Sequence, residues 1–161
     1  MVSQAYDDAF YSDRRYSMNS AKVIVPLILD LMDVKSVVDV GCGMGEFLHV
    51  FSQMGTKEIL GIDGEWIRHE KLQIPEEYFL SKDLEKPLHL DRKFDLAISL
   101  EVAEHLNESS AKGFIDSLTN LIYPIPQILS FSGTVLLANF MCQFFINLVQ
   151  CMFNRAQIFG I

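Results

Sequence analysis

A cluster of glycines after a short apolar run is the feature that most limits how this chain can fold. Residues 37–48 read VVDVGCGMGEFL, with three glycines in five positions. The β-branched run at residues 36–40 predicts a buried strand, and the apolar spacing of residues 46–54, stopped by Gly55, predicts a helix. In an open α/β sheet, a glycine-rich turn from strand to helix brings the backbone closest to a ligand. The segment therefore predicts a ligand-binding turn, for a pyrophosphate, a triphosphate or some other ligand.

Two acidic residues beside these glycines narrow the choice of ligand. A triphosphate-binding loop needs the pattern G-x-x-x-x-G-K-[ST], which does not occur in the sequence. The dinucleotide fingerprint G-x-G-x-x-G fits Gly41 and Gly43, but its third glycine is Glu46, whose carboxylate would oppose a pyrophosphate at the helix N-terminus. Asp39 adds a second negative charge just before the turn. These residues favour a ligand with positive charge. S-adenosylmethionine fits this preference, because it carries an ammonium and a sulfonium but no phosphate.

Strand and helix patterns alternate along the rest of the chain. Further strands are predicted at residues 58–63, 78–80 and 94–100, and further helices at residues 21–32 and 111–121. The first of these helices would be capped by Asn19 or Ser20. The alternation predicts an α/β fold with a doubly wound, mostly parallel sheet. At 161 residues the chain has room for one domain, so we expect a polar arm at residues 1–19 and a single domain over residues 20–161.

The net charge and the cysteine content limit which partners and which cellular compartment are expected. The formal net charge is −8 and no cluster of Lys and Arg occurs, so nucleic acid is not an expected partner, because binding its backbone needs a basic surface. The three cysteines have no metal-ligand spacing, which favours a reduced, cytoplasmic chain. The N-terminal segment carries acidic residues where a signal peptide would have a basic start and an apolar stretch, so secretion is not expected.

The segment DVGCGMGEFL resembles motif I of the class I S-adenosylmethionine-dependent methyltransferases, in which an acidic residue is followed by GxGxG. The resemblance implies the Rossmann-like fold of that family and S-adenosyl-L-methionine as the cofactor. It also implies that five residues of the segment border the cofactor: Asp39, Gly41, Cys42, Gly43 and Gly45.

Two later segments match the family's adenosine-binding motifs in the right order. EILGIDG contains Asp63 and Gly64, and an acid at the end of this strand can accept hydrogen bonds from both ribose hydroxyls. In SKDLEKPL, Asp83 matches the acid that accepts from the adenine amino group, and Leu84 matches the apolar residue that covers the ring. Trp66 lies just beyond the ribose-binding position, where either a contact with adenine or a place in the core suits it.

The run FDLAISLEVAEHL resembles the family's fourth strand and the loop that follows it. The resemblance places Ser99 and Leu100 beside the transferable methyl group as cofactor-binding residues, with Glu101 and His105 as catalytic candidates. An imidazole has a pKa suited to taking a proton from a hydroxyl or an amine near neutral pH, and the alternative for His105 is packing against the sheet. With Glu104 these residues also make a metal-ligand combination, but similar metal sites use a further downstream histidine that this chain lacks, so no metal is expected.

The last forty residues depart from the family pattern. No charged residue occurs between Asp116 and Arg155, and residues 128–149 are mostly apolar. Polar residues interrupt that run and no basic flank precedes it, which favours a buried strand around residues 127–131 or 134–138, followed by a core helix, over a membrane span. No membrane partner is therefore expected. The family's polar substrate loop and last strands are not recognisable, and we expect a truncated or altered C-terminal end.

The leading hypothesis is an S-adenosylmethionine-dependent methyltransferase that transfers a methyl group to an O, N or C nucleophile of a small-molecule or glycan-type substrate. The alternative is a non-catalytic S-adenosylmethionine-binding or interaction module, which the altered C-terminal half favours. A nucleotide-dependent oxidoreductase is disfavoured by Glu46.

Overall fold

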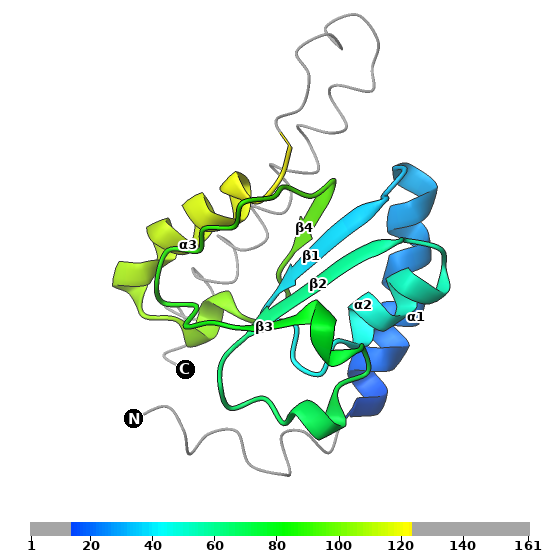
Figure 1. The fold of residues 1–161 in the computed structure, drawn as a ribbon, viewed down its shortest axis with the longest axis horizontal. Coiled ribbons are helices and arrows are strands. Elements are labelled where there is room, and N and C mark those ends of the chain that lie inside the picture. The colour runs from blue at the N-terminus through cyan, green and yellow to red at the C-terminus, as the bar shows by residue number, and fades with distance from the viewer. Residues whose placement is uncertain (1–13, 124–161) are drawn as a thin grey trace, which may run out of the picture.

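Strands and helices alternate in the computed structural model, which describes residues 14–123 (Figure 1). The strands are β1 (Ser36–Val40), β2 (Glu58–Asp63), β3 (Phe79–Ser81) and β4 (Leu96–Ile98). The α-helices are α1 (Arg14–Leu31), α2 (Glu46–Gln53) and α3 (Glu108–Asn120). Short 3₁₀ helices lie in the connections: η2 (His69–Lys71), η3 (Glu76–Tyr78) and η4 (Ala103–His105). The α/β fold class predicted from the sequence is confirmed.

The four strands form one parallel sheet in the order β3-β2-β1-β4. β1 pairs along its whole length with β2, from Ser36 opposite Glu58 to Val40 opposite Ile62. The chain adds β2 and β3 on one side of β1 and then crosses to β4 on the other side, so the strand order reverses between β1 and β4. Ligands of open α/β sheets bind beyond the carboxyl ends of the strands at such a reversal. The glycine turn follows β1 at this place.

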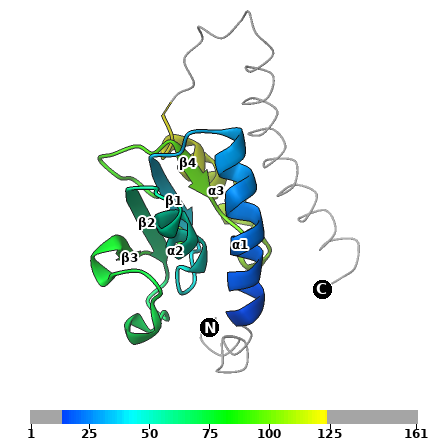
Figure 2. The same cartoon turned by 90° about the vertical axis from the view of Figure 1, so that its right-hand side faces the viewer.

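Helices cover both faces of the sheet, with α1 and α2 on one face and α3 on the other (Figures 1 and 2). One buried cluster includes Val37 together with Leu48 and Phe51 of α2. A second cluster includes Val38 together with Phe114 of α3. Neighbouring residues of β1 thus serve opposite faces, as the two-residue period of a strand requires. All five residues of β1 are buried, which is typical of a central parallel strand.

The chain returns to the sheet after α3. The Phe94 N–H donates to the Leu121 carbonyl at 2.8 Å, and the Tyr123 N–H donates to the Phe94 carbonyl at 3.0 Å. Together these bonds form a parallel bridge between Phe94 and Ile122. The strand predicted at residues 127–131 or 134–138, and the helix predicted after it, lie outside the described residues.

Helix α1 begins seven residues earlier than the sequence predicted, at Arg14 rather than at residue 21, so the two residues expected to cap it lie inside the helix. The buried side chains of Ala21 and Val25 form a stripe that the partly buried Met18 extends toward the N-terminus. Such packing outweighs a local preference for capping. Residues 14–19 of the expected arm therefore belong to α1, and the rest of the arm lies outside the described residues.

The remaining boundaries differ less. β3 lies one residue later than predicted, and β4 covers only the middle of the strand predicted at residues 94–100. Helix α3 begins at Glu108, directly after Asn107, a residue type favoured before helix starts.

Within residues 14–123, no helix combines the length and apolar character needed to cross a bilayer. The apolar run at residues 128–149 lies outside the part of the chain that the structure describes.

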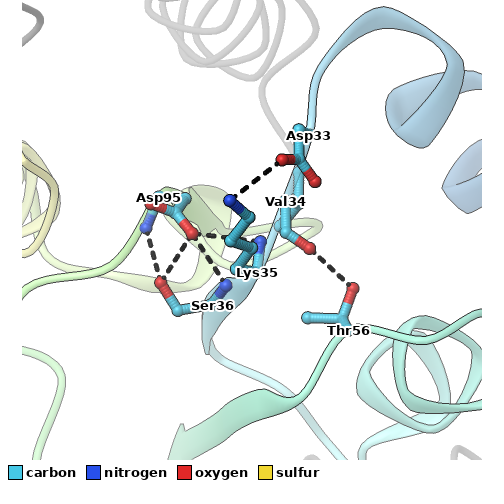
Figure 3. Close-up of polar contacts among 6 residues, drawn as sticks. All are labelled: Asp33, Val34, Lys35, Ser36, Thr56 and Asp95. Atoms are coloured by element: carbon cyan, nitrogen blue, oxygen red, sulfur yellow. Dashed lines mark hydrogen bonds and ion pairs between the residues drawn. The ribbon is translucent and has the colours of Figure 1, made fainter.

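Asp95 ties the starts of β1 and β4 together, at the end of the sheet opposite the glycine turn (Figure 3). Its Oδ2 atom accepts hydrogen bonds from the Lys35 N–H at 3.0 Å, the Ser36 N–H at 2.9 Å and the Ser36 hydroxyl at 3.0 Å. In return, the Asp95 N–H donates to Ser36 Oγ at 2.9 Å. Beside this group, the Thr56 hydroxyl donates to the Val34 carbonyl at 3.1 Å. Side chains thus hold the short β1–β4 pairing at its start.

Replacing Asp95 with alanine is expected to lower the free energy of unfolding by about 2 kcal/mol, because two backbone N–H groups and a hydroxyl lose a charged acceptor. Urea denaturation followed by circular dichroism measures the loss. Asp91→Ala, at an exposed position in the preceding loop, is the matched control and should cost less than about 0.5 kcal/mol. Equal losses in the two variants would show that Asp95 does not hold the strands.

Candidate functional site

The glycine turn between β1 and α2 has a backbone that other residues adopt only with strain. Gly41, Gly43 and Gly45 have φ angles of 85°, 55° and 83°. The turn is fastened to the end of β2, because the Gly41 and Cys42 N–H groups both donate to the Ile62 carbonyl, at 2.7 and 3.2 Å. The sequence pattern therefore reflects a conformational requirement, since glycine reaches positive φ without a steric penalty.

Close approach of other segments is a second reason for glycine. A Cβ atom at Gly41 would lie 2.1 Å from Cγ2 of Val102, a residue in the loop after β4. A Cβ atom at Gly61 in β2 would lie 2.7 Å from the Cys42 sulfur. A Cβ atom at Gly43, in contrast, would meet nothing within 4 Å. The turn is thus packed against β2 through Cys42 and against the loop after β4 through Gly41, and it is open at Gly43.

Asp63 joins the end of β2 to the glycine turn. Its Oδ2 atom accepts a hydrogen bond from the Gly43 N–H at 2.8 Å, and its Oδ1 atom accepts one from the Gly64 N–H at 2.7 Å. The side chain of Trp66 also hydrogen-bonds this carboxylate. Burial raises the pKa of Asp63, and these three hydrogen bonds oppose the rise by stabilising the charged form. The structure therefore joins the glycine turn to the end of β2, two segments that the sequence assigned to the same cofactor.

Two further carboxylates are buried beside the turn. Asp39 is 3% exposed and Glu46 is 6% exposed, as is Asp63. Burial raises the pKa of Asp39 well above its usual value, and the charges of Asp63 and Glu46 raise it further. Burial and the same acids also raise the pKa of the Cys42 thiol, which leaves it protonated and unreactive. The concentration of negative charge favours a cation and opposes a phosphate at this place.

The segment after β3 lies against the end of β2, since the Lys82 N–H donates to the Asp63 carbonyl at 2.8 Å. Asp83 lies in a turn, where its carboxylate accepts from the Glu85 N–H at 3.1 Å and pairs with Lys86 at 3.0 Å. The contact with Lys86 lowers the pKa of Asp83. Leu84 is buried in the cluster on the α3 face. Contacts of Asp83 and Leu84 with adenine stay predictions.

The loop after β4 forms the remaining side of the site. The Ser99 hydroxyl donates to the Val40 carbonyl at 2.7 Å, which ties the end of β4 to the end of β1. Leu100 follows directly, and Glu101 has a φ of 57°, a left-handed conformation that is uncommon for a residue with a side chain. Strain of this kind occurs more often at functional sites than elsewhere.

Glu101, Glu104 and His105 lie close to one another in this loop. Burial raises the pKa of Glu101, a hydrogen bond with Glu104 and the charge of Glu104 raise it further, and His105 opposes the rise. One carboxylate oxygen of Glu104, Oε2, is buried and has no hydrogen-bond partner among the described residues. The imidazole of His105 is exposed and therefore accessible to a substrate. In residues 14–123, no three His, Cys, Asp or Glu side chains form a group able to hold a metal ion.

The family model described as a methyltransferase domain matches residues 13–124, which is more than half of the chain. The chain belongs to the methyltransferase domain family. The resemblance to class I methyltransferases inferred from motif I is thereby confirmed.

Individual relatives agree with this assignment. The mitochondrial ubiquinone biosynthesis O-methyltransferase of Dictyostelium discoideum is 30% identical over 105 residues, which cover 55% of this chain and 32% of that protein. An amino pentose methyltransferase of Micromonospora echinaspora, solved with S-adenosylmethionine bound, superposes with a TM-score of 0.57 and 16% identity over 75% of this chain and 54% of that one. The Streptomyces venezuelae protein DesVI gives a TM-score of 0.59 and 22% identity over 74% and 54%. These structures establish the Rossmann-like methyltransferase fold.

The chain spans about a third of the length of the curated relative and about half of the length of the two solved structures.

Sequence reasoning missed Ser81, whose hydroxyl is buried at the end of β3 without a hydrogen-bond partner in the described part of the chain. It also missed the packing of Val102 and Ile74 against Gly41 and Gly45. No local pattern signals either feature, because each depends on segments that are distant in sequence.

Proposed function

We propose that this chain binds S-adenosyl-L-methionine at the glycine turn and forms the cofactor-binding part of a methyltransferase that acts on a small-molecule or glycan-type substrate. The observation that carries the proposal is the Asp63 carboxylate, held by the Gly43 and Gly64 N–H groups at the end of β2. A carboxylate fixed there is suited to accept hydrogen bonds from ribose hydroxyls. The buried charges of Asp39 and Glu46 then select a cationic methionyl group over a pyrophosphate.

The shape of the site fits an extended ligand of this kind. The turn is open at Gly43, so a ligand can lie against its backbone there. The buried hydroxyl of Ser81 lies on the residue that pairs in register with Asp63, and it offers a further polar contact at the same edge of the sheet. Cys42 takes part through its backbone, because its thiol points into the packing against Gly61. The family relation supports the same cofactor.

When bound, the cofactor supplies a methyl group that its sulfonium already activates, so the protein has to align the substrate and remove a proton. Ser99 and Leu100 directly follow β4, where the strand order reverses, and would border the methyl group. We assign proton removal from a hydroxyl or amine substrate to His105, whose ring is exposed beside this strand end. The Glu101 carboxylate interacts electrostatically with His105 and would stabilise the imidazolium that forms.

We also propose a reducing compartment, the cytoplasm, as the location of the chain. The proposal is supported by the thiol of Cys42, which is buried and forms no disulfide within residues 14–123.

Isothermal titration calorimetry with S-adenosylhomocysteine, which needs no methyl acceptor, tests the proposal directly. Wild-type protein is expected to bind, and Asp63→Ala is expected to bind at least about tenfold more weakly, a loss of about 1.4 kcal/mol. Because Asp63 also holds the turn, Asp63→Asn is included as the conservative change, and urea denaturation reports whether either variant has lost stability. Asp91→Ala is the matched control and should bind like wild type.

Two results would contradict the proposal. The first is no heat of binding in wild-type protein that unfolds cooperatively. The second is binding of NAD in preference to S-adenosylhomocysteine, which would assign the turn to a pyrophosphate despite Glu46. Binding of the cofactor without turnover across a broad panel of acceptors would instead support the non-catalytic binding module.

A further inference from the structure

The side chain of Trp66 folds back over the glycine that follows Asp63. A Cβ atom at Gly64 would lie 2.2 Å from the ring atoms Cη2 and Cζ3 and 2.4 Å from Cε3, so the ring rests directly on the Gly64 backbone. Trp66 is 45% exposed and is therefore a surface residue, which decides against a place in the core. The ring needs a residue without a side chain beneath it, and Gly64 provides that space.

The same tryptophan occupies an acceptor position of Asp63. The Trp66 side chain hydrogen-bonds the Asp63 carboxylate, and the indole N–H is its donor. With the N–H groups of Gly43 and Gly64, the carboxylate accepts three hydrogen bonds in the free protein. It is also 6% exposed, so little of it remains open to a ligand.

These contacts conflict with recognition of a ribose. A carboxylate has about four acceptor sites, and two ribose hydroxyls would bring the number of donors to about five. One donor must therefore leave when a ribose binds. The N–H groups of Gly43, within the glycine turn, and of Gly64, directly after β2, belong to the backbone, and moving them would disrupt the local fold. The indole lies on an exposed side chain and can leave by rotation alone.

We infer that Trp66 covers the ribose-binding edge of Asp63 in the free protein and competes with the cofactor, so that binding exchanges the indole N–H for a ribose hydroxyl. Trp66 is thus a residue that sets cofactor affinity rather than a part of the core. The inference rests on the proposed function and deepens it, because it concerns the same site. It also implies selection for ligands with a free vicinal diol, since only these regain the hydrogen bond that the indole gives up.

The chain contains one tryptophan, so its fluorescence reports on this residue alone. Titration of wild-type protein with S-adenosylhomocysteine is expected to change the emission, with the same midpoint as the calorimetric titration. Trp66→Phe keeps a ring but removes the competing N–H, and is expected to bind S-adenosylhomocysteine about fivefold more tightly by calorimetry. Tyr123→Phe is the matched control, since it removes the hydroxyl of an aromatic residue that is 57% exposed at the opposite end of the sheet, and its affinity should equal that of wild type.

Gly64→Ala tests the contact without any ligand. The added Cβ would displace the ring, so collisional quenching of the free protein by acrylamide is expected to rise relative to wild type. An unchanged quenching constant would overturn the inference, because the ring would then not rest on Gly64.

The outcomes separate this inference from the proposed function. If wild-type protein binds S-adenosylhomocysteine while Trp66→Phe binds equally or more weakly, or if the wild-type emission does not change, competition by Trp66 is excluded and cofactor binding stands. If neither wild type nor Trp66→Phe releases heat with S-adenosylhomocysteine, the proposed function fails and the inference fails with it.

Discussion

Replacing Gly41 with alanine is expected to lower the free energy of unfolding by at least about 3 kcal/mol. Two costs add at this position. The φ of 85° is unfavourable for any residue with a side chain, and the new Cβ would lie 2.1 Å from Cγ2 of Val102. The turn and the loop after β4 would have to separate to make room. Urea denaturation measures the loss, and a cooperative transition must be seen for the value to be used.

Gly43→Ala is the matched comparison, because it lies in the same turn and also has a positive φ, of 55°. A Cβ at Gly43 meets nothing within 4 Å, so the stability cost is limited to the backbone and should be about 1 kcal/mol. The methyl group would instead project into the open side of the turn, where the cofactor is proposed to lie. Gly43→Ala should therefore lose mainly cofactor affinity and Gly41→Ala mainly stability. Equal losses of stability would contradict the packing of Val102 on Gly41.

Replacing Asp39 with asparagine is expected to have opposite effects on stability and on binding. At pH values above the raised pKa of Asp39, the free energy of unfolding should rise by on the order of 1–2 kcal/mol, because the neutral amide keeps the shape of the side chain and removes a buried charge. That charge is unfavourable through its own burial and through Asp63 and Glu46 beside it. Affinity for S-adenosylmethionine should fall about tenfold, because a buried cation loses one of its counter-charges.

The pH dependence of stability provides a separate test of the same group. The pKa of Asp39 in the folded protein is raised well above its usual value of 3.8, so the folded state binds more protons than the unfolded state between these two values. The free energy of unfolding should therefore fall as pH rises from 3.8 through the folded pKa. In Asp39→Asn this slope should be smaller, although Asp63, whose pKa is also raised, still contributes in the same direction.

A comparison of ligands and a charge control complete the experiment. S-adenosylhomocysteine lacks the sulfonium charge, so its affinity should fall less in Asp39→Asn than that of S-adenosylmethionine. Asp91→Asn makes the same change of charge at an exposed position and should leave both stability and affinity unchanged. A less stable Asp39→Asn variant, or one with wild-type affinity, would show that Asp39 is a structural residue.

The central part of the fold could be predicted closely from the sequence. β1 and β2 have the bounds predicted for them, residues 36–40 and 58–63. Both are central parallel strands, and burial on two faces produces continuous apolar runs with turn residues at their ends. The start of α1 could not be predicted, because it is decided by packing of Met18 and its neighbours against the core rather than by a local signal.

The candidate site could be predicted in its components but not in its contacts. The glycines, Asp39 and Asp63 carry local patterns that point to a cofactor. The contact of Gly41 with Val102 joins residues far apart in the chain, and the ring of Trp66 over Gly64 depends on a side-chain rotamer. A sequence pattern shows which residue types are present, whereas contacts of this kind depend on the geometry of the assembled sheet.

The β1–β4 pairing is only three residues long, yet side chains secure it at both ends. Asp95 and Ser36 hold its start, and the Ser99 hydroxyl holds its end through the Val40 carbonyl. The position of β4 relative to β1 is therefore set by two serine hydroxyls and one carboxylate as much as by backbone pairing, so an exchange of Ser36, Ser99 or Asp95 would act on strand spacing before it acted on the core.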